Sequence, residues 1–401
     1  MISSRERIVL YALLTSLTSL SIDALLPGLH AIAADLAPAP PLSTQHVVSL
    51  FVCGMALGEL LLGPLSDALG RKRALLAGLG VYLAGTVIAM LAGSLDMVIL
   101  GRFLQGVGVS GPKIATRAMI RDQFEGAAMA RVMSFMFTLF ILVPMIAPAL
   151  AQGLIATAGW RSVFVAYLVI ATALGLWLAI RQPETLAKER RIPVRPRVLI
   201  ANIGRILGHR QVVLLIAATG IVFGAQLLYV STAADLFYDA YGIRDSFPLY
   251  FAALATAIGL ASYLNGRLVE RFGMDAMARA GFIGLTLSGL TMTLASILAG
   301  GNMALPLLMA LLYGAFFSIG LLFGNLNAMA MRALGQVAGL GASLIASGSS
   351  LVATVFAVGF GRFYDGGDTN LALGLLTGGV LSLVMAQLAA RGGSHAVQAV
   401  R

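Results

Sequence analysis

The chain has 401 residues, of which 59% are hydrophobic and only 11% are charged. A soluble domain carries about 25% charged residues, so this composition leaves too little polar surface to cover a globule in water. The net charge of +10 does not indicate nucleic-acid binding, because the basic residues lie in short connectors between apolar runs rather than on one basic face. The one cysteine, Cys53, lies inside an apolar run, which excludes a disulfide framework and a cysteine metal site.

Apolar runs of membrane-spanning length follow one another along the chain. One crossing needs roughly 20 apolar residues, because the hydrocarbon layer is about 30 Å thick and a helix rises about 1.5 Å per residue. The first run is longer than a signal-peptide core and lacks a small-residue cleavage site, so we interpret it as a span. Twelve spans are predicted, at residues 8–29, 45–66, 74–95, 98–117, 132–153, 160–180, 211–235, 247–268, 279–299, 304–328, 337–361 and 370–390.

A polar segment divides these spans into two sets of six. Residues 181–210 contain Pro183, Pro193 and Pro196 together with many Lys and Arg residues, a composition that cannot cross a membrane. We predict a linker at 181–210, between an N-terminal six-helix bundle at residues 1–180 and a C-terminal six-helix bundle at residues 211–401. The expected fold class is an all-α integral membrane protein with twelve transmembrane helices in two pseudosymmetric bundles.

The distribution of basic residues predicts the orientation in the membrane. Most Lys and Arg residues fall on the side that holds both termini and the linker. Because the side that retains positive charge faces the cytoplasm, both termini and the linker are predicted to be cytoplasmic. We expect a multi-pass protein of the bacterial inner (plasma) membrane, surrounded by lipid.

An internal repeat supports the division into halves. Glycine, leucine, an acidic residue and glycine recur at the same spacing after the second and the eighth span, which indicates a duplication. The two copies are Gly63-Pro-Leu65-Ser-Asp67-Ala-Leu-Gly70 and Gly266-Arg-Leu268-Val-Glu270-Arg-Phe-Gly273.

The first copy resembles the signature of the major facilitator superfamily between spans two and three, G-x-L-x-D-x-x-G-R-[KR]-[KR], which Gly63, Leu65, Asp67, Gly70, Arg71, Lys72 and Arg73 meet. Arg102-Phe-Leu-Gln105-Gly106 resembles the fourth-span signature of that family. Ser21-Ile-Asp23-Ala-Leu-Leu-Pro27 and Arg117-Ala-Met-Ile-Arg121-Asp122 narrow the similarity to the Bcr/CflA-type multidrug exporters. In the fifth span, Ala147, Ala151 and Gln152 replace glycines of the antiporter signature, although Pro148 remains.

The resemblance implies a gating role for the segment from Gly63 to Arg73, in which the candidate gating residues are Gly63, Asp67, Gly70 and Arg71, together with Glu270 of the second copy. Gly63 and Gly70 permit close backbone approach and a tight turn, and Asp67 can meet a helix N-terminus or a basic partner. The alternative, basic residues that serve topology alone, explains Lys72 and Arg73 but not Asp67.

Charged residues inside spans are functional candidates, because each costs roughly 2.5 to 3.5 kcal/mol on insertion scales. Asp23 in the first span and Arg102 in the fourth lie at similar depth when counted from opposite sides. Our hypothesis is that Asp23 takes up and releases a proton while Arg102 lies close enough to influence it. Pro27 removes a hydrogen bond to the carbonyl of residue 23 and is expected to bend the helix there. The alternative is a static ion pair that only holds the helices together.

A polar stripe on the fourth span is a candidate for substrate binding. Arg102, Gln105, Lys113 and Thr116 share one helical face, whose positive charge suits an anionic or zwitterionic substrate. Lys113 and Arg117 are alternatively placed to extend to the headgroups. In the second half, four uncharged polar residues are candidates either for hydrogen-bonding the substrate or for hydrogen-bonding one helix to another. They are Gln226, Tyr229, Asn325 and Asn327.

Two other patterns carry no chemistry. Gly106-Val-Gly108-Val-Ser-Gly111 fits G-x-G-x-x-G, but it lies inside a span and follows no strand, so we expect helix packing instead of nucleotide binding. The histidines, His30, His46, His209 and His395, are expected in solvated connectors or the tail, without metal-ligand spacing. No metal, cofactor or enzymatic activity is expected.

The predicted function is proton-coupled export (antiport) of small amphipathic or anionic compounds such as drugs, by alternating access with a substrate site between the two bundles. The alternative is proton-coupled uptake of an organic anion or nutrient. The expected partners are a small-molecule substrate and protons, and the protein is expected to be a monomer.

Overall fold

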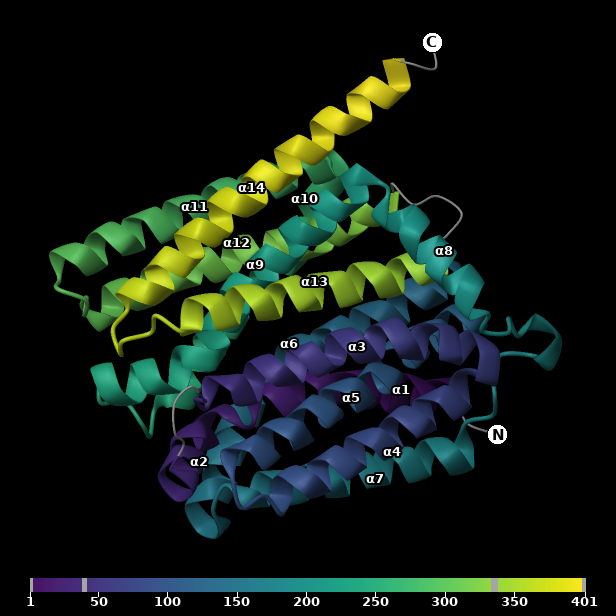
Figure 1. The fold of residues 1–401 in the computed structure, drawn as a ribbon, viewed down its shortest axis with the longest axis horizontal. Helices are drawn as coiled ribbons and strands as arrows, with labels where there is room; N and C mark the ends of the chain where they lie inside the picture. The colour runs from purple at the N-terminus through teal and green to yellow at the C-terminus, as the bar shows by residue number, and fades with distance from the viewer. Residues whose placement is uncertain (1–2, 38–41, 333–337, 399–401) are drawn as a thin grey trace. The chain divides into compact units, whose positions relative to one another are not determined.

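The computed structural model describes residues 3–37, 42–332 and 338–398, and the regular elements within these ranges are helices. The chain divides into two compact units, residues 1–195 and 196–401 (Figure 1). The boundary between the units lies inside the segment 181–210.

The first unit begins with a capped helix. The Ser3 hydroxyl accepts the backbone N–H of Glu6 at 3.1 Å, and the Glu6 carboxylate accepts the backbone N–H of Ser3 in return, a capping box that starts the helix at Ser4. The long helices are α1 (Ser4–Asp23), α3 (Gln45–Leu69), α4 (Arg71–Met90), α5 (Leu95–Gln123), α6 (Gly126–Ala158) and α7 (Arg161–Arg181). Shorter elements are the 3-10 turn η1 (Leu26–Gly28), α2 (Leu29–Leu36) and the 3-10 turn η2 (Lys188–Arg190).

The second unit contains α8 (Pro196–Leu207), α9 (Arg210–Asp235), the π-helical turn η3 (Leu236–Ala240), α10 (Phe247–Phe272), α11 (Met274–Leu298), α12 (Leu305–Arg332), α13 (Ala338–Gly361) and α14 (Thr369–Gln398). Its loops meet at a buried carboxylate. Asp368 is fully buried and accepts the backbone N–H of Met303 at 2.8 Å, the Tyr241 hydroxyl at 3.0 Å and the Ser296 hydroxyl. One side chain thus joins three connections of the unit.

Each of the twelve predicted spans corresponds to a long helix, counting α1, η1 and α2 together. Within the described ranges, ten helical segments are long and apolar enough to cross a membrane, and the α6 segment Leu142–Ala158 is a shorter apolar helix. The remaining span is α5, whose hydropathy is lowered by the charged and polar side chains of its stripe. The all-helical membrane fold is confirmed.

Close packing through glycines holds α5 between α3 and α4 (Figure 1). A Cβ atom added to Gly106 would lie 2.0 Å from the carbonyl oxygen of Phe51, and one added to Gly54 would lie 2.0 Å from that of Phe103. A Cβ on Gly108 would approach the backbone of Tyr82 on α4. These glycines therefore pack helices, as expected, and form no phosphate loop.

Candidate functional site

The helix of the first predicted span is interrupted directly after Asp23. Helix α1 ends at Asp23, and the chain continues through η1, which contains Pro27, before α2 resumes. Proline has no N–H to donate, so the carbonyl of Asp23 loses its helical partner, as the sequence predicts. Broken helices at which backbone and charged groups become available are typical of ion and substrate sites in transporters.

The Asp23 side chain is buried, with 7% exposure. In the part of the chain that the structure describes, its carboxylate forms no hydrogen bond and no ion pair. The static pair with Arg102, one of the two alternatives considered from the sequence, is therefore not formed. The carboxylate is buried and available, which is the arrangement expected of a group that exchanges a proton.

Arg102 is fully buried in the N-terminal third of α5 and lies at the centre of a polar network. Its Nε donates to the carbonyl of Val47 at 3.2 Å, its Nη1 donates to Oε1 of Gln105 at 2.9 Å, and its guanidinium lies 4.3 Å above the ring of Phe51. Gln105 in turn donates to the Thr86 hydroxyl at 2.7 Å. Arg102 Nη2 has no hydrogen-bond partner among the described residues, so one donor is left for another group.

Two buried tyrosines lie around the end of α1. The Tyr82 hydroxyl on α4 is 2.7 Å from the Ser21 hydroxyl, two residues before Asp23. The Tyr167 hydroxyl on α7 donates to the carbonyl of Leu20 at 3.2 Å. The Arg102 guanidinium also interacts electrostatically with Tyr82 and Tyr167. Arg102 and the end of α1 thus belong to the same polar interior, although Asp23 and Arg102 are not bonded to each other.

Lys113 does not stand alone in the membrane, because it pairs with a second buried acid. Its Nζ lies 2.5 Å from Oε1 of Glu59 on α3, and the Glu59 side chain is fully buried while that of Lys113 is 20% exposed. Sequence reasoning overlooked Glu59, although residue 59 lies within the predicted span 45–66. The feature that could have identified Glu59 is the presence of a second acidic residue inside a predicted span.

Arg117, one turn beyond Lys113, is exposed, and it interacts electrostatically with Glu59. Thr116, the last member of the stripe, is fully buried, and its hydroxyl has no partner within the described ranges. The stripe thus has fully buried members at Arg102, Gln105 and Thr116 and a partly exposed member at Lys113.

The predicted gating segment forms a charged cluster with the chain that follows α7. We call Asp67, Arg71, Asp122 and Glu184 the linker cluster. The Arg71 side chain pairs with Asp67 and donates through Nε to Asp122 Oδ2 at 3.2 Å. Gly70 ends α3 with a φ of 105°, which only glycine adopts without strain, and Gly63 is buried four residues after Glu59.

Glu184 closes the N-terminus of α4. Its Oε1 accepts the backbone N–H groups of Arg71 at 2.8 Å and Thr185 at 3.0 Å. The backbone N–H of Ile192 donates to the carbonyl of Asp67 at 3.1 Å, so the segment after α7 is attached to both helices of the turn. Anionic groups are favourable at this position because the N-terminal amides have no helical partner.

The candidates of the second unit are less organised. Asn325 on α12 donates to Asn265 on α10 at 2.7 Å, whereas Asn327 is exposed and donates to its own helix. Tyr229 is fully buried against Phe316 and Phe251, and its hydroxyl has no partner in the described residues. Gln226 is half-buried, and Glu270 is exposed at the end of α10; within the described ranges neither forms a hydrogen bond or ion pair.

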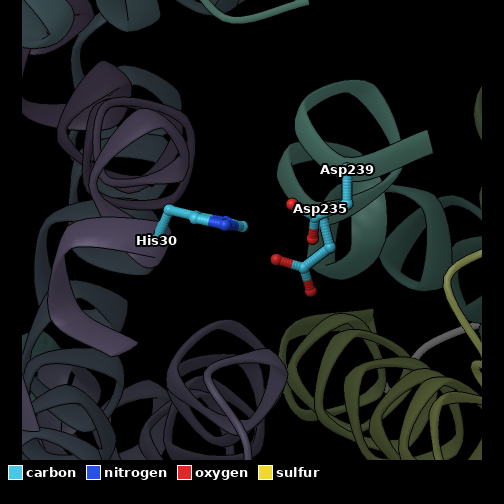
Figure 2. A group of neighbouring side chains, drawn as sticks. All are labelled: His30, Asp235 and Asp239. Carbon is cyan, nitrogen blue, oxygen red and sulfur yellow. The ribbon is translucent and has the colours of Figure 1, made fainter. Parts of the chain in front are cut away.

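Two histidines lie elsewhere than expected. His30 lies in α2 and His46 in α3, where its Nδ1 is 3.1 Å from the Ser43 hydroxyl, so their placement in connectors was wrong. The side chain of His395 lies outside the described residues. Figure 2 shows His30 with Asp235 and Asp239, but the histidine belongs to the first unit and the aspartates to the second, so we assign them no joint site.

Charged groups inside membrane helices are typical of proteins that move ions or substrates past them. The helical membrane fold with buried charged residues therefore defines a class of secondary transporter. The model of the Major Facilitator Superfamily matches residues 11–362, and the chain belongs to this family. It is a multi-pass membrane transporter of small molecules and not an enzyme, and the resemblance seen in its motifs is confirmed.

Known relatives include drug-resistance proteins. A bicyclomycin resistance protein homolog of Haemophilus influenzae is 28% identical over 344 residues, which cover 85% of each chain. The multidrug transporter MdfA of Yersinia pestis is 29% identical over 170 residues, or 42% of this chain and 41% of its own. A solved D-xylose-proton symporter has a TM-score of 0.72 at 16% identity, covering 96% of this chain and 97% of its own. That last likeness shows the fold alone.

Proposed function

We propose that the protein exports small amphipathic compounds, drugs among them, in exchange for protons by alternating access. Family membership and the names of the drug-resistance relatives support export. The proposed location is the bacterial inner membrane, with both termini and the linker cytoplasmic, and the proposed state is a monomer.

The observation that carries the proposal is the carboxyl group of Asp23. It is buried at the break after α1 and has no partner among the described residues. A buried charge is costly unless it is paired, so the proton occupancy of Asp23 is linked to its exposure and therefore to conformation. Arg102, with one donor left unbonded, is the group proposed to influence Asp23 as the helices move.

The polar residues of the helices are proposed to contact the substrate. In the first unit these are Gln105, Lys113 and Arg117, and in the second Gln226, Tyr229, Asn325 and Asn327. The linker cluster, together with Gly63, Gly70 and Glu270, is proposed to gate access. The contacts of Arg71 and Glu184 support this role, because they join α3, α4, α5 and the segment after α7 through charged groups that can separate.

Purified protein in proteoliposomes tests the proposal. A pH gradient is imposed, and a panel of anionic, neutral and cationic compounds is offered. Accumulation of a compound against the direction of proton flow, lost in Asp23→Asn, is the expected result. Movement of every transported compound together with protons would contradict antiport.

The second candidate is proton-coupled uptake of an organic anion or nutrient. It is favoured by the charged pair of Lys113 and Glu59 and by the alanines at positions 147 and 151 of α6, where exporters of the antiporter type have glycine. The same proteoliposome assay separates the two candidates, because uptake requires the substrate and the proton to move together.

A further inference from the structure

Glu59 and Lys113 form an ion pair inside the first unit. Neither Asp23 nor Arg102 is hydrogen-bonded to this pair. Glu59 is fully buried in α3, and Lys113 on α5 places its Nζ 2.5 Å from Oε1 of Glu59 and 3.6 Å from Sδ of Met55. The two helices are in close contact at this level, because a Cβ on Gly58 would lie 2.3 Å from the carbonyl of Val107. The helix packing therefore holds the carboxylate against the ammonium group.

A second cation lies near this pair. Arg117 also interacts electrostatically with Glu59, so one carboxylate faces two cations. Lys113 is 20% exposed and Arg117 is exposed, whereas the Glu59 side chain is fully buried. Two accessible cations beside one internal carboxylate form a site that suits an anion.

We propose that Glu59 occupies the anion position of Lys113 in the empty transporter, and that a carboxylate or sulfonate group of the substrate replaces it. When this happens, the Glu59 carboxylate takes a proton from water and becomes a neutral carboxylic acid, while Lys113 stays charged and pairs with the substrate anion. The proposal rests on the second candidate function, in which the substrate and a proton move together, and it names the chemical class of substrate that this position accepts.

The exchange follows from the cost of buried charge. Removing the partner of a buried ion is strongly destabilising, so Lys113 requires one anion at all times. If the substrate supplies the anion, a Glu59 that remained charged would lose its contact with Lys113 in the helix interior, and protonation lowers that cost. Anion binding and protonation of Glu59 therefore strengthen each other, so an anionic substrate and a proton are bound together, as the second candidate function requires.

The other titratable groups near α3 have different partners or positions. On the helices packed against α3, Arg102 and Tyr82 belong to the polar network, and Asp67, Arg71 and Asp122 belong to the linker cluster. Lys72 donates to the carbonyl of Ala179. The remaining titratable groups are His46 and Cys53 on α3, Arg73 on α4, and Asp96 and Arg121 on α5. The pH dependence is assigned to Glu59 because its carboxylate is the one in contact with Lys113.

Binding of benzenesulfonate to the purified full-length protein in detergent tests the proposal. This probe stays anionic across the range studied, so any pH dependence belongs to the protein. Isothermal titration calorimetry at about pH 5 and about pH 8 is expected to show wild-type affinity falling with rising pH, by up to about tenfold per pH unit. Glu59→Gln is expected to bind equally at both pH values, at least as tightly as wild type at the lower pH. Lys113→Gln is expected not to bind.

Two controls separate a lost site from a misfolded protein. The double variant Glu59→Gln with Lys113→Gln replaces the pair with neutral residues of similar size, and its helical circular dichroism is expected to match wild type while benzenesulfonate binding is absent. Benzenesulfonamide, a neutral probe of the same shape, is expected to show no dependence on Glu59.

The proposal is overturned if benzenesulfonate binds neither wild type nor Glu59→Gln, or if Glu59→Gln keeps the pH dependence of wild type. These outcomes leave the proposed function intact when proteoliposomes still move neutral or cationic compounds against protons. Conversely, pH-dependent benzenesulfonate binding without any proton-driven transport would refute the proposed function while retaining the anion site.

Discussion

The carboxylate of Glu184, which follows the last helix of the first unit, accepts the backbone N–H of Arg71 at 2.8 Å across a separation of 113 residues. This contact places a negative charge on the N-terminus of α4, directly after the turn at Gly70. The turn that carries the family signature is therefore held by a residue outside that signature.

Replacement of Glu184 by alanine is expected to loosen the segment after α7. The substitution removes the acceptor of several backbone N–H groups at a helix N-terminus, at a cost of about 1 to 2 kcal/mol. Because 1.4 kcal/mol is a tenfold change in an equilibrium constant, tryptic cleavage after Lys188 is expected to become about tenfold faster in Glu184→Ala. Glu125→Ala, an exposed acid before α6 that makes no capping hydrogen bond, is the control and should leave the rate unchanged, because it lies outside the cleaved segment. Equal rates in the two variants would contradict the role of Glu184.

Replacement of Asp23 by asparagine is expected to uncouple transport from protons. The amide keeps the size of the side chain but cannot take up and release a proton at this position. Transport driven by a pH gradient in proteoliposomes should fall at least about tenfold, while slow downhill movement persists without pH dependence. Asp35→Asn is the matched control, because Asp35 lies on the surface of α2 in an ion pair with Arg161 at 2.7 Å. Wild-type pH dependence in Asp23→Asn would remove the proton role.

Replacement of Gly106 by alanine is expected to destabilise the first unit. Its Cβ would lie 2.0 Å from the carbonyl oxygen of Phe51, so α3 and α5 would have to move apart, at a cost of about 1 to 3 kcal/mol. Thermal unfolding in detergent, followed by circular dichroism, should show a lower midpoint. Gly80→Ala on α4 is the control, because its Cβ meets nothing within 4 Å. A Gly106→Ala midpoint equal to that of Gly80→Ala would show that the two helices do not need this close approach.

Replacement of Asp368 by alanine is expected to destabilise the second unit. The change leaves the hydroxyls of Tyr241 and Ser296 and the backbone N–H of Met303 without their buried acceptor, at a cost of about 3 kcal/mol. Burial and the adjacent Asp368 carboxylate raise the pKa of Tyr241, which keeps that hydroxyl protonated as a donor. Proteolysis or thermal unfolding should separate Asp368→Ala from Asp365→Ala, since Asp365 is exposed. Similar losses in both variants would argue against the buried junction.

The helices and their breaks could be predicted from the sequence. Every predicted span corresponds to a helix or to a helix pair broken at Pro27, because apolar length and proline position are local properties of the chain. The buried charges Asp23 and Arg102 could also be found, since each is a rare residue type inside an apolar run. His30 was misplaced because the first span continues as α2 beyond its predicted end at residue 29.

The sequence by itself determined a helical membrane protein with ionisable groups inside it, because the lipid interior requires every backbone group to be satisfied within its own segment. The tertiary structure alone decided which of these groups meet. Glu59 pairs with Lys113 across 54 residues, and Glu184 reaches Arg71 across 113. The physical reason is that such pairs depend on which helix faces touch, and close contact between helices is set by glycines whose partners are distant in the chain.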